Sequence, residues 1–465
     1  IFSVRHPNRI FTAGAEENHH NRTSETFFDM SRILRLMALC CAALCSQMTF
    51  AQPRVIGIDE LFRLAEEQSM SIRSFESGAA AAAEGVRAAR AERLPDVGVT
   101  VSASFLGDGR LWDRSFGEGM KVDIPHFGNN FALEAQQVVY AGGAVRSGIR
   151  MAELEQRDAE TSLERNRQDI CFLLLGHYLN LYKADNRIRV LRENLALTEQ
   201  VLETMRARRE QGTVLQNDIT RYELRREQLR LELQRAEDTG TILNHRLVTA
   251  LHLPEGTEIR PDTALLQTGI GTLSQSDWQD VARENNLDLR SAQTGIGMSD
   301  EAVRLQRSER LPKVSLMAAD HLDGPITIEV PVLNNNFNYW YVGVGIRYNI
   351  ASLFKSGRRI RQAELYARRA RESYDLECER VDNAVQESYV NLMTAEADLR
   401  TQQKSVELAD ENYAVVSNRY ANDLALLTDM LDAGNTKLEA DLALVEARIN
   451  LIYDYYRMKY VTHTL

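Results

Sequence analysis

The sequence predicts a mainly α-helical protein with a β-barrel part, and three observations carry that prediction. Two long stretches have a hydrophobic period of 3.5 residues, four shorter stretches alternate with a period of 2, and the order of segments occurs twice. The 465 residues, 44% hydrophobic and 26% charged, would suffice for several domains, but the repeat favours one duplicated fold. The net charge of −11 gives no support for nucleic acid as a partner.

The N-terminal part has the features of an export signal. Residues 1–29 are polar and aperiodic, and we interpret them as an upstream segment, non-native or disordered. Residues 30–51 combine a basic start, an apolar run and small residues before a cut near Gln52, which predicts a signal peptide. The run is shorter than the ~20 residues of a membrane span. A membrane-spanning helix and lipid attachment at Cys45 stay open as alternatives.

Three of the five cysteines lie in this predicted signal. Cys171 and Cys378 remain, in the oxidising setting of an exported protein, where a disulfide is allowed. Each falls inside a predicted long helix, at nearly equivalent repeat positions. We therefore expect them in different helix pairs, as two buried free thiols.

The internal repeat is visible in short recurring segments. The segment "AERLPDVGV" that begins at residue 91 returns as "SERLPKVSL" at 308, and "GHYLNL" at 176 returns as "ESYVNL" at 387. By this repeat Asp218 corresponds to Asp429. We expect residues 52–254 to form the first structural repeat, 255–276 a linker or equatorial region, and 277–465 the second repeat.

Each repeat is predicted to hold a very long helix and a return helix. The long helices are expected at about 144–210 and 355–421, and the return helices at about 216–252 and 425–463. At ~1.5 Å per residue each long helix would reach on the order of 100 Å. A sustained 3.5-residue period predicts a left-handed coiled coil. The seam of the first long helix comprises Ile170, Leu174, His177, Leu181, Ala184, Ile188, Leu191, Leu195, Thr198, Leu202 and Met205. We interpret His177 as a packed or hydrogen-bonded core position, with a metal ligand as the alternative.

Four stretches change to a period of 2, at about 96–106, 131–141, 313–322 and 338–350. In "NYWYVGVGIRYNI" the apolar side chains share one face, and Trp340 and Tyr348 bracket the apolar band. This pattern is typical of transmembrane β-strands, which place aromatic side chains at the membrane interface. We expect Phe105, Trp340 and Tyr348 at that interface. A four-stranded soluble sheet packed on helices is the alternative.

Four strands cannot close a membrane barrel alone. Lipid tolerates no open sheet edge, and small membrane barrels start at about eight strands. Two chains would supply eight strands and three would supply twelve. The sequence therefore demands an oligomer without choosing between these numbers.

Several motifs carry a resemblance to a known family. They are the "ERLP" entry to each first strand, "YAGG" at 140–143, "KSGRRIRQAE" at 355–364 and "LLTDMLDAG" at 426–434. With the tandem repeat, they make the chain from about residue 58 onward resemble the outer-membrane efflux protein (TolC) family. The resemblance implies a homotrimer in the outer membrane of a Gram-negative bacterium, with a 12-stranded barrel continuous with a periplasmic α-helical barrel.

The resemblance also implies partners and a function. The channel would be recruited by a periplasmic adaptor (a membrane fusion protein) and an inner-membrane pump of RND or ABC type, to expel drugs, metals or proteins. The hairpin tips that would meet the adaptor match Gln211, Gly212, Thr213, Asn422, Asp423 and Leu424.

Two further sets of residues are implied by the resemblance. The pore-constricting aspartates of the family match Asp429 and Asp432. Its closed-state lock, a Tyr, an Arg and an Asp, matches Tyr420, Ala425 and Asp218, so the Arg is missing. Candidates for the substitute cation are Arg419 and Lys437.

The break in the second long helix supports a gate on other grounds. Asp429 and Asp432 stand three residues apart, so they share one helix face, and in a trimer they would form two stacked acidic rings. Such rings bind and select cations. The alternative is that Asp429 only caps or salt-bridges the hairpin. Asp432 is the sharper marker because its repeat mate is Arg221.

The leading hypothesis is thus a passive trans-periplasmic exit duct of an efflux system. The alternatives are the exit duct of a type I protein secretion system and, in a different class, a soluble periplasmic coiled-coil structural or adaptor protein. The sequence contains no metal motif, nucleophile elbow or phosphate loop, so we expect no enzyme activity and no cofactor. The exported cargo is not encoded in a recognisable motif.

Overall fold

The computed structural model describes residues 54–262, 271 and 273–465. The segment 1–29 and the predicted signal peptide at 30–51 lie outside the described residues. The chain divides into a small unit, residues 1–54 with 256–258, and a large unit, residues 55–255 with 259–465. The arrangement given below is that within the large unit.

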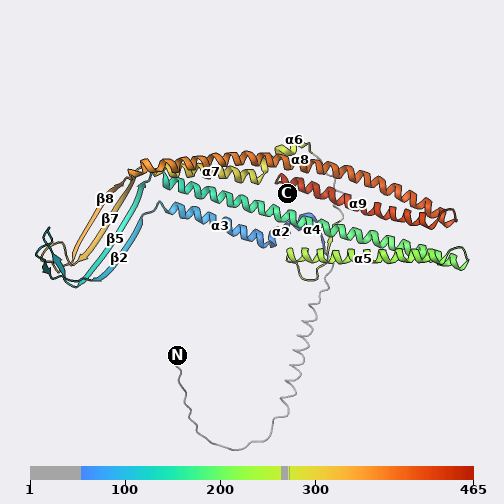
Figure 1. The fold of residues 1–465 in the computed structure, drawn as a ribbon, viewed down its shortest axis with the longest axis horizontal. Helices are drawn as coiled ribbons and strands as arrows, with labels where there is room; N and C mark the ends of the chain where they lie inside the picture. Colours follow the sequence, from blue (N-terminus) through green and yellow to red (C-terminus); the bar gives the residue numbers. More distant parts are fainter. Residues whose placement is uncertain (1–53, 263–270, 272) are drawn as a thin grey trace, which may run out of the picture. The chain divides into compact units, whose positions relative to one another are not determined.

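The large unit contains the same order of elements twice. The first set is α2 (Ile58–Gln68), α3 (Met70–Ala91), β2 (Asp96–Phe105), β5 (Phe127–Tyr140), α4 (Ala144–Glu210) and α5 (Gln216–Ala250). The second set is α6 (Gln275–Asn285), α7 (Leu287–Ser308), β7 (Lys313–Gly324), β8 (Phe337–Arg347), α8 (Ala351–Ala421) and α9 (Leu427–Val461). In Figure 1, α3 and α5 run along α4, and α7 and α9 run along α8. The expected fold class, a mainly helical tandem repeat with four strands, is confirmed.

Helix starts follow ordinary capping chemistry. The Ser69 side chain accepts a hydrogen bond from the backbone N–H of Ile72 at the start of α3, and Ser274 and Asp277 form a capping box at the start of α6. At the start of α7 the Asn286 side chain accepts hydrogen bonds from two backbone N–H groups. Ser69 therefore separates α2 from α3, and Asn286 separates α6 from α7.

The four main strands form one antiparallel sheet in the order β2-β5-β7-β8. Val101 of β2 is paired with Phe131 of β5 in the first repeat, and Ala318 of β7 is paired with Val342 of β8 in the second. Strands β5 and β7 are paired with each other, so the two repeats meet in the middle of the sheet. Within the described chain, the outer edges of β2 and β8 have no partner strand. A short hairpin of β3 (Gly109–Leu111) and β4 (Met120–Val122), which the sequence did not indicate, lies in the loop between β2 and β5.

The apolar face of this sheet is open. The outward side chains of the two edge strands are at least 61% exposed: Val97, Val99, Val101, Phe105, Trp340, Val342, Val344 and Ile346. The sheet continues from the ends of the long helices, and no described helix packs over its faces (Figure 1). The alternative of a soluble sheet packed on helices is therefore not what the chain forms.

Strand β8 ends earlier than expected. It stops at Arg347, so Tyr348 and Ile350 lie beyond it although they continue the alternation of the sequence. The backbone carbonyl of Asn349 accepts hydrogen bonds from the Ser352 N–H at 3.0 Å and the Ser352 hydroxyl at 2.6 Å. This turn leads directly into α8 and ends the strand.

The core is distributed along the helices. Seam residues of α4 are buried, among them Leu174, Leu181, Leu191, Leu202 and Met205, and so are Val381, Val385 and Leu392 of α8. His177 is only half-buried and lines a surface hollow together with Gly176. It is therefore not the packed or hydrogen-bonded core position that was expected. No cluster suited to a metal ion occurs in the described ranges.

The two remaining cysteines are unpaired. Cys171 is buried, and burial raises the pKa of its thiol to about 12. Cys378 was expected to be buried but is only half-buried, because it lies with Tyr374 at the rim of the cluster around Trp278.

Among the described residues, no helix is both long enough and apolar enough to cross a membrane.

Candidate gate at the hairpin tips

The two hairpins, α4–α5 and α8–α9, end in turns with the same backbone. In the first turn the N–H groups of Gly212 and Thr213 donate to the carbonyls of Arg209 at 2.8 Å and Arg208 at 3.1 Å. In the second turn the N–H groups of Asp423 and Leu424 donate to the carbonyls of Tyr420 at 3.1 Å and Arg419 at 2.8 Å. The central residue has a positive φ in both, 78° at Gly212 and 60° at Asp423. The tip glycine is thus replaced by Asp423 without any change of turn type, because Asp tolerates the left-handed conformation.

The residues expected to meet an adaptor are accessible. All six of these residues are exposed to solvent: Gln211, Gly212, Thr213, Asn422, Asp423 and Leu424. Leu215 and Leu426, which precede the return helices, are exposed too. We refer to residues 211–213 as the first tip and to residues 422–424 as the second tip.

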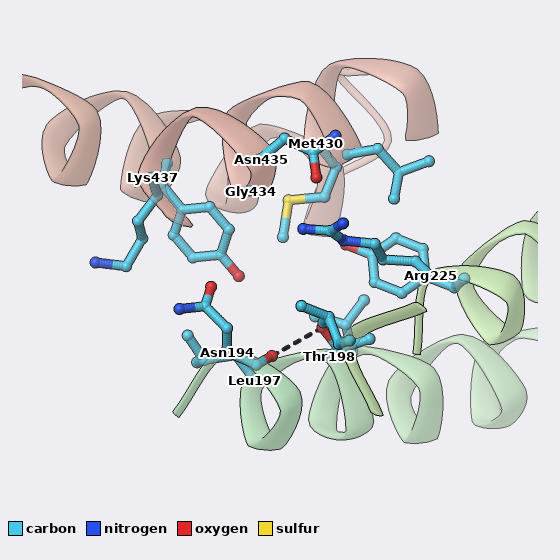
Figure 2. A pocket seen from close by; sticks show the side chains of 13 residues that line it. Asn194, Leu197, Thr198, Arg225, Met430, Gly434, Asn435 and Lys437 are labelled. Carbon is cyan, nitrogen blue, oxygen red and sulfur yellow. Dashed lines mark hydrogen bonds between the residues drawn. The ribbon is translucent and has the colours of Figure 1, made fainter. Parts of the chain in front are cut away.

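Behind the tips the two hairpins pack on each other. One apolar cluster joins Leu202, Met205, Ile219 and Tyr222 of the first hairpin to Leu427 and Met430 of the second. Beside it lies a cavity of about 30 Å³, lined by residues of both hairpins (Figure 2). Arg225 and Lys437 border this cavity, and the buried Asn435 Oδ1 has no hydrogen-bond partner in the described chain. A polar cavity of that size has room for a water molecule.

The two candidate gate aspartates differ in what they contact. The Asp429 Oδ2 accepts a hydrogen bond of 2.9 Å from the backbone N–H of Leu426, so Asp429 caps the start of α9. Asp432 is exposed and makes no ion pair or side-chain hydrogen bond with any described residue. The capping alternative therefore applies to Asp429, whereas the Asp432 carboxylate is free to face a pore.

The expected lock residues lie near one another without the expected bond. Tyr420 and Asp218 are both half-buried, and the pKa of the Tyr420 phenol is raised, mainly by burial and also by the Asp218 and Asp423 carboxylates. Within the described chain, however, the phenol makes no hydrogen bond to Asp218. Ala425, at the position of the missing Arg, is half-buried and contributes no charge.

Neither candidate for the substitute cation reaches this contact. Lys437 forms ion pairs with Asp410 and, at 3.6 Å, with Asp441, all within the second hairpin. Arg419 is exposed and has no ion pair with a described residue. The cation that lies between the tips is Arg208, whose guanidinium donates to the Tyr420 carbonyl and to the Asp423 carboxylate. Arg208 was not among the residues predicted for the gate, and its one signal in the sequence is that its repeat mate is Arg419.

The membrane-interface aromatics lie at different places on the sheet. Phe105 is the last residue of β2 and stacks on His126, with ring centroids 5.2 Å apart. Trp340 is exposed on the open apolar face of β8, and Tyr348 follows the end of that strand.

Comparisons with known proteins agree with this architecture. A family model described as "Outer membrane efflux protein" matches residues 61–251 and 278–455. The outer membrane efflux protein BepC of Brucella suis is 23% identical over 332 residues, which cover 70% of each chain.

Two solved structures share the fold. The outer membrane protein VceC of Vibrio cholerae has a TM-score of 0.73 at 15% identity, covering 87% of this chain and 95% of that one. The CmeC outer membrane channel of Campylobacter jejuni has a TM-score of 0.69 at 15% identity, covering 88% of this chain and 85% of that one.

Proposed function

The chain belongs to the outer membrane efflux protein family, and from that premise we propose that it is a passive exit duct that crosses the periplasm. Members of this family are outer-membrane channels of Gram-negative bacteria and not enzymes. The duct would act without catalysis or cofactor. It would open at its periplasmic end when the hairpins rearrange.

The observation that carries this proposal is the sheet with an open apolar face and with two edges that have no partner strand among the described residues. In water such a face would be costly, at about 25 cal/mol for each Å² of apolar surface. In lipid the face is stable, but each open edge would leave backbone N–H and C=O groups unsatisfied. Closure with strands of further copies pairs the edges, and insertion of the closed barrel in lipid covers the apolar face, so the two together remove both costs. A homotrimer supplies twelve strands, with Phe105, Trp340 and Tyr348 at the membrane interface.

The helical hairpins provide the other end of the proposed duct. Three copies of the two repeats, 52–254 and 277–465, would extend the wall of the barrel as a tube of paired helices. The exposed first and second tips are then available to a periplasmic adaptor and, through it, to an inner-membrane pump of RND or ABC type. In the trimer Asp432 would form an acidic ring, with Asp429 one turn away, and this ring would be the gate.

Fractionation tests the membrane part of the proposal. The mature protein should sediment with the outer membrane, require detergent for extraction, run as a trimer after chemical crosslinking, and form ion-conducting pores in planar bilayers. Recovery as a soluble protein without detergent would contradict the proposal and favour a periplasmic spacer.

A matched pair of variants sharpens this experiment. Val101→Arg places a charge on the apolar face of β2 and should abolish outer-membrane insertion, since a cation on the lipid face costs about 2–4 kcal/mol at the midplane. Thr100→Arg places the same charge on the opposite face of the same strand and should leave insertion intact. Equal insertion of the two variants would argue against a lipid-facing role for this sheet.

A further inference from the structure

Arg208 connects the two hairpins at their tips. It lies in the last turn of α4, and its side chain is only 17% exposed although it carries a charge at the end of a helix. Its Nη1 donates a hydrogen bond of 3.2 Å to the backbone carbonyl of Tyr420, and its Nη2 donates to the Asp423 carboxylate. The guanidinium carbon also lies 5.7 Å from the centroid of the Tyr420 ring. One side chain of the first hairpin thus makes three contacts with the second.

The three contacts differ in their exposure to water. The Arg208 side chain is only 17% exposed, so water reaches its guanidinium poorly, whereas the Asp423 side chain is 69% exposed and solvent screens its side of the ion pair. Fixing an Arg side chain in one rotamer costs conformational entropy, and the hydrogen bond to the Tyr420 carbonyl and the contact with the Tyr420 ring act with the ion pair against that cost. Arg208 is thus packed between the hairpins and is not a freely solvated surface residue.

Arg208 has a partner at the tip of the other hairpin, but within the described chain its repeat mate Arg419 does not. Asp423 occupies the left-handed position that Gly212 holds in the first tip, so the second tip has a carboxylate where the first has no side chain. Arg419, the repeat mate of Arg208, is exposed and has no ion pair with the described residues. The two turns therefore have the same backbone, but only the second carries a carboxylate, Asp423, and the Arg208 guanidinium of the first hairpin binds it.

We propose that Arg208 is the cation of the closed-state lock, clamping the first hairpin to the second through Asp423 and Tyr420 of the same chain. This proposal rests on the function proposed above, in which the hairpins separate to open the duct. Arg208 supplies the charge that is absent at Ala425, but from the opposite hairpin. A movement that separates the tips must break all three contacts at once, and Arg208 is therefore a positioning residue of the gate.

Planar-bilayer recordings of the purified full chain test the clamp. Arg208→Gln removes the charge, and Asp423→Asn removes its counterion while keeping a residue that tolerates the left-handed backbone. Each should raise the mean conductance at low voltage by roughly five-fold or more, since loss of about 1 kcal/mol is about a five-fold change in an equilibrium constant. The double variant should resemble Arg208→Gln alone, because residues of one contact are not additive.

Four further variants, two of them controls, separate the clamp from a general effect of charge. Arg209→Gln removes the adjacent exposed cation, and Arg419→Gln removes the repeat mate; both should leave the conductance unchanged. Arg208→Lys keeps the charge but loses the planar fork of the guanidinium, and should fall between wild type and Arg208→Gln. Asp423→Gly gives the second tip the residue of the first, and should fold normally and still raise the conductance.

The outcomes distinguish the clamp from the proposed function. If the wild-type protein forms pores but Arg208→Gln, Asp423→Asn and Asp423→Gly conduct like it, the clamp is wrong and the duct stands. Fully additive effects of Arg208→Gln and Asp423→Asn would also overturn the clamp. If the wild-type chain forms no pores, the proposed function and the clamp fail together.

Discussion

The two hairpin tips share a backbone and differ in side chains. Both turns place a residue with positive φ at the centre, and in both the return helix starts four residues later, at Gln216 and at Leu427. The first hairpin has Gly212 at the centre of the turn and Arg221 on the return helix. The second hairpin has Asp423 and Asp432 at the corresponding positions. The two copies of the repeat thus share the turn geometry, and the substitutions between them make the second hairpin more negatively charged in this region.

This difference assigns separate tasks to the two hairpins. The second hairpin offers carboxylates, one of which, Asp423, is bound by Arg208 while another, Asp432, is left exposed. The first hairpin supplies the cation Arg208, and it has Gly212 and Arg221 where the second hairpin has its two aspartates. A duplicated fold can therefore produce an asymmetric contact while both copies keep the same main-chain conformation. Variants of the shared packing and turn geometry, and of the side chains that differ between the hairpins, test this comparison.

The largest expected effect comes from the apolar cluster that both hairpins share. Leu202 is 1% exposed and packs in the cluster with Leu427 and Met430 of the other hairpin. Leu202→Ala should destabilise the protein by about 2–5 kcal/mol, through lost burial and the cavity left behind. Leu202→Met, which nearly conserves volume, should cost less than about 1.5 kcal/mol. Thermal unfolding in detergent, followed by circular dichroism, measures both; equal losses would show that packing at this site is not limiting.

A smaller effect is expected at the centre of the first turn. Gly212 has φ 78°, a conformation in which a Cβ costs about 1–2 kcal/mol. Gly212→Ala should therefore lower stability by about that amount, and Gly212→Asn by less, because Asn tolerates the left-handed region. The same unfolding assay compares the two variants. If Ala and Asn were equally tolerated, the turn would not require this backbone conformation.

The smallest effect is expected from the cap of α9. Asp429 accepts the Leu426 N–H and lies in the first turn of α9, where a negative charge is worth about 0.3–1 kcal/mol. Asp429→Ala should lower stability by up to about 1 kcal/mol, because it removes both this charge and the hydrogen bond to the N-cap residue. Asp218→Ala, at the same position of α5, should cost less because the Asp218 carboxylate makes no such bond with the described residues. A larger loss for Asp218→Ala in the unfolding assay would reverse this assignment.

Local periodicity made much of the fold predictable. The 3.5-residue period covers the long helices and the 2-residue period covers the sheet, because both patterns depend on neighbours close in the sequence. The end of β8 was mispredicted since Tyr348 and Ile350 continue the alternation, while the hydrogen bonds of Ser352 to Asn349 start a turn. A hydropathy pattern does not reveal such a turn, because the turn depends on the hydrogen bonds of a single polar residue.

The candidate site was predictable only in part. The helix break, the spacing of Asp429 and Asp432, and the contrast of Asp432 with Arg221 are visible in the letters of the sequence. The contact between Arg208 and Asp423 was not predictable, because the two residues lie 215 positions apart and a single Arg among many has no distinguishing pattern. Side-chain contacts between the two hairpins depend on their packing, which periodicity does not specify.

Single-channel recording of Asp432→Ala in planar bilayers tests the central claim most directly, with Arg221→Ala at the repeat-related position as the control. A duct gated by an acidic ring of three Asp432 carboxylates predicts block of the wild-type channel by divalent cations. Asp432→Ala should then relieve that block and raise the conductance, and the combined change with Asp429→Ala should relieve it further, whereas Arg221→Ala should keep the block. Unchanged conductance and block in Asp432→Ala would contradict the account and remove this residue from the gate.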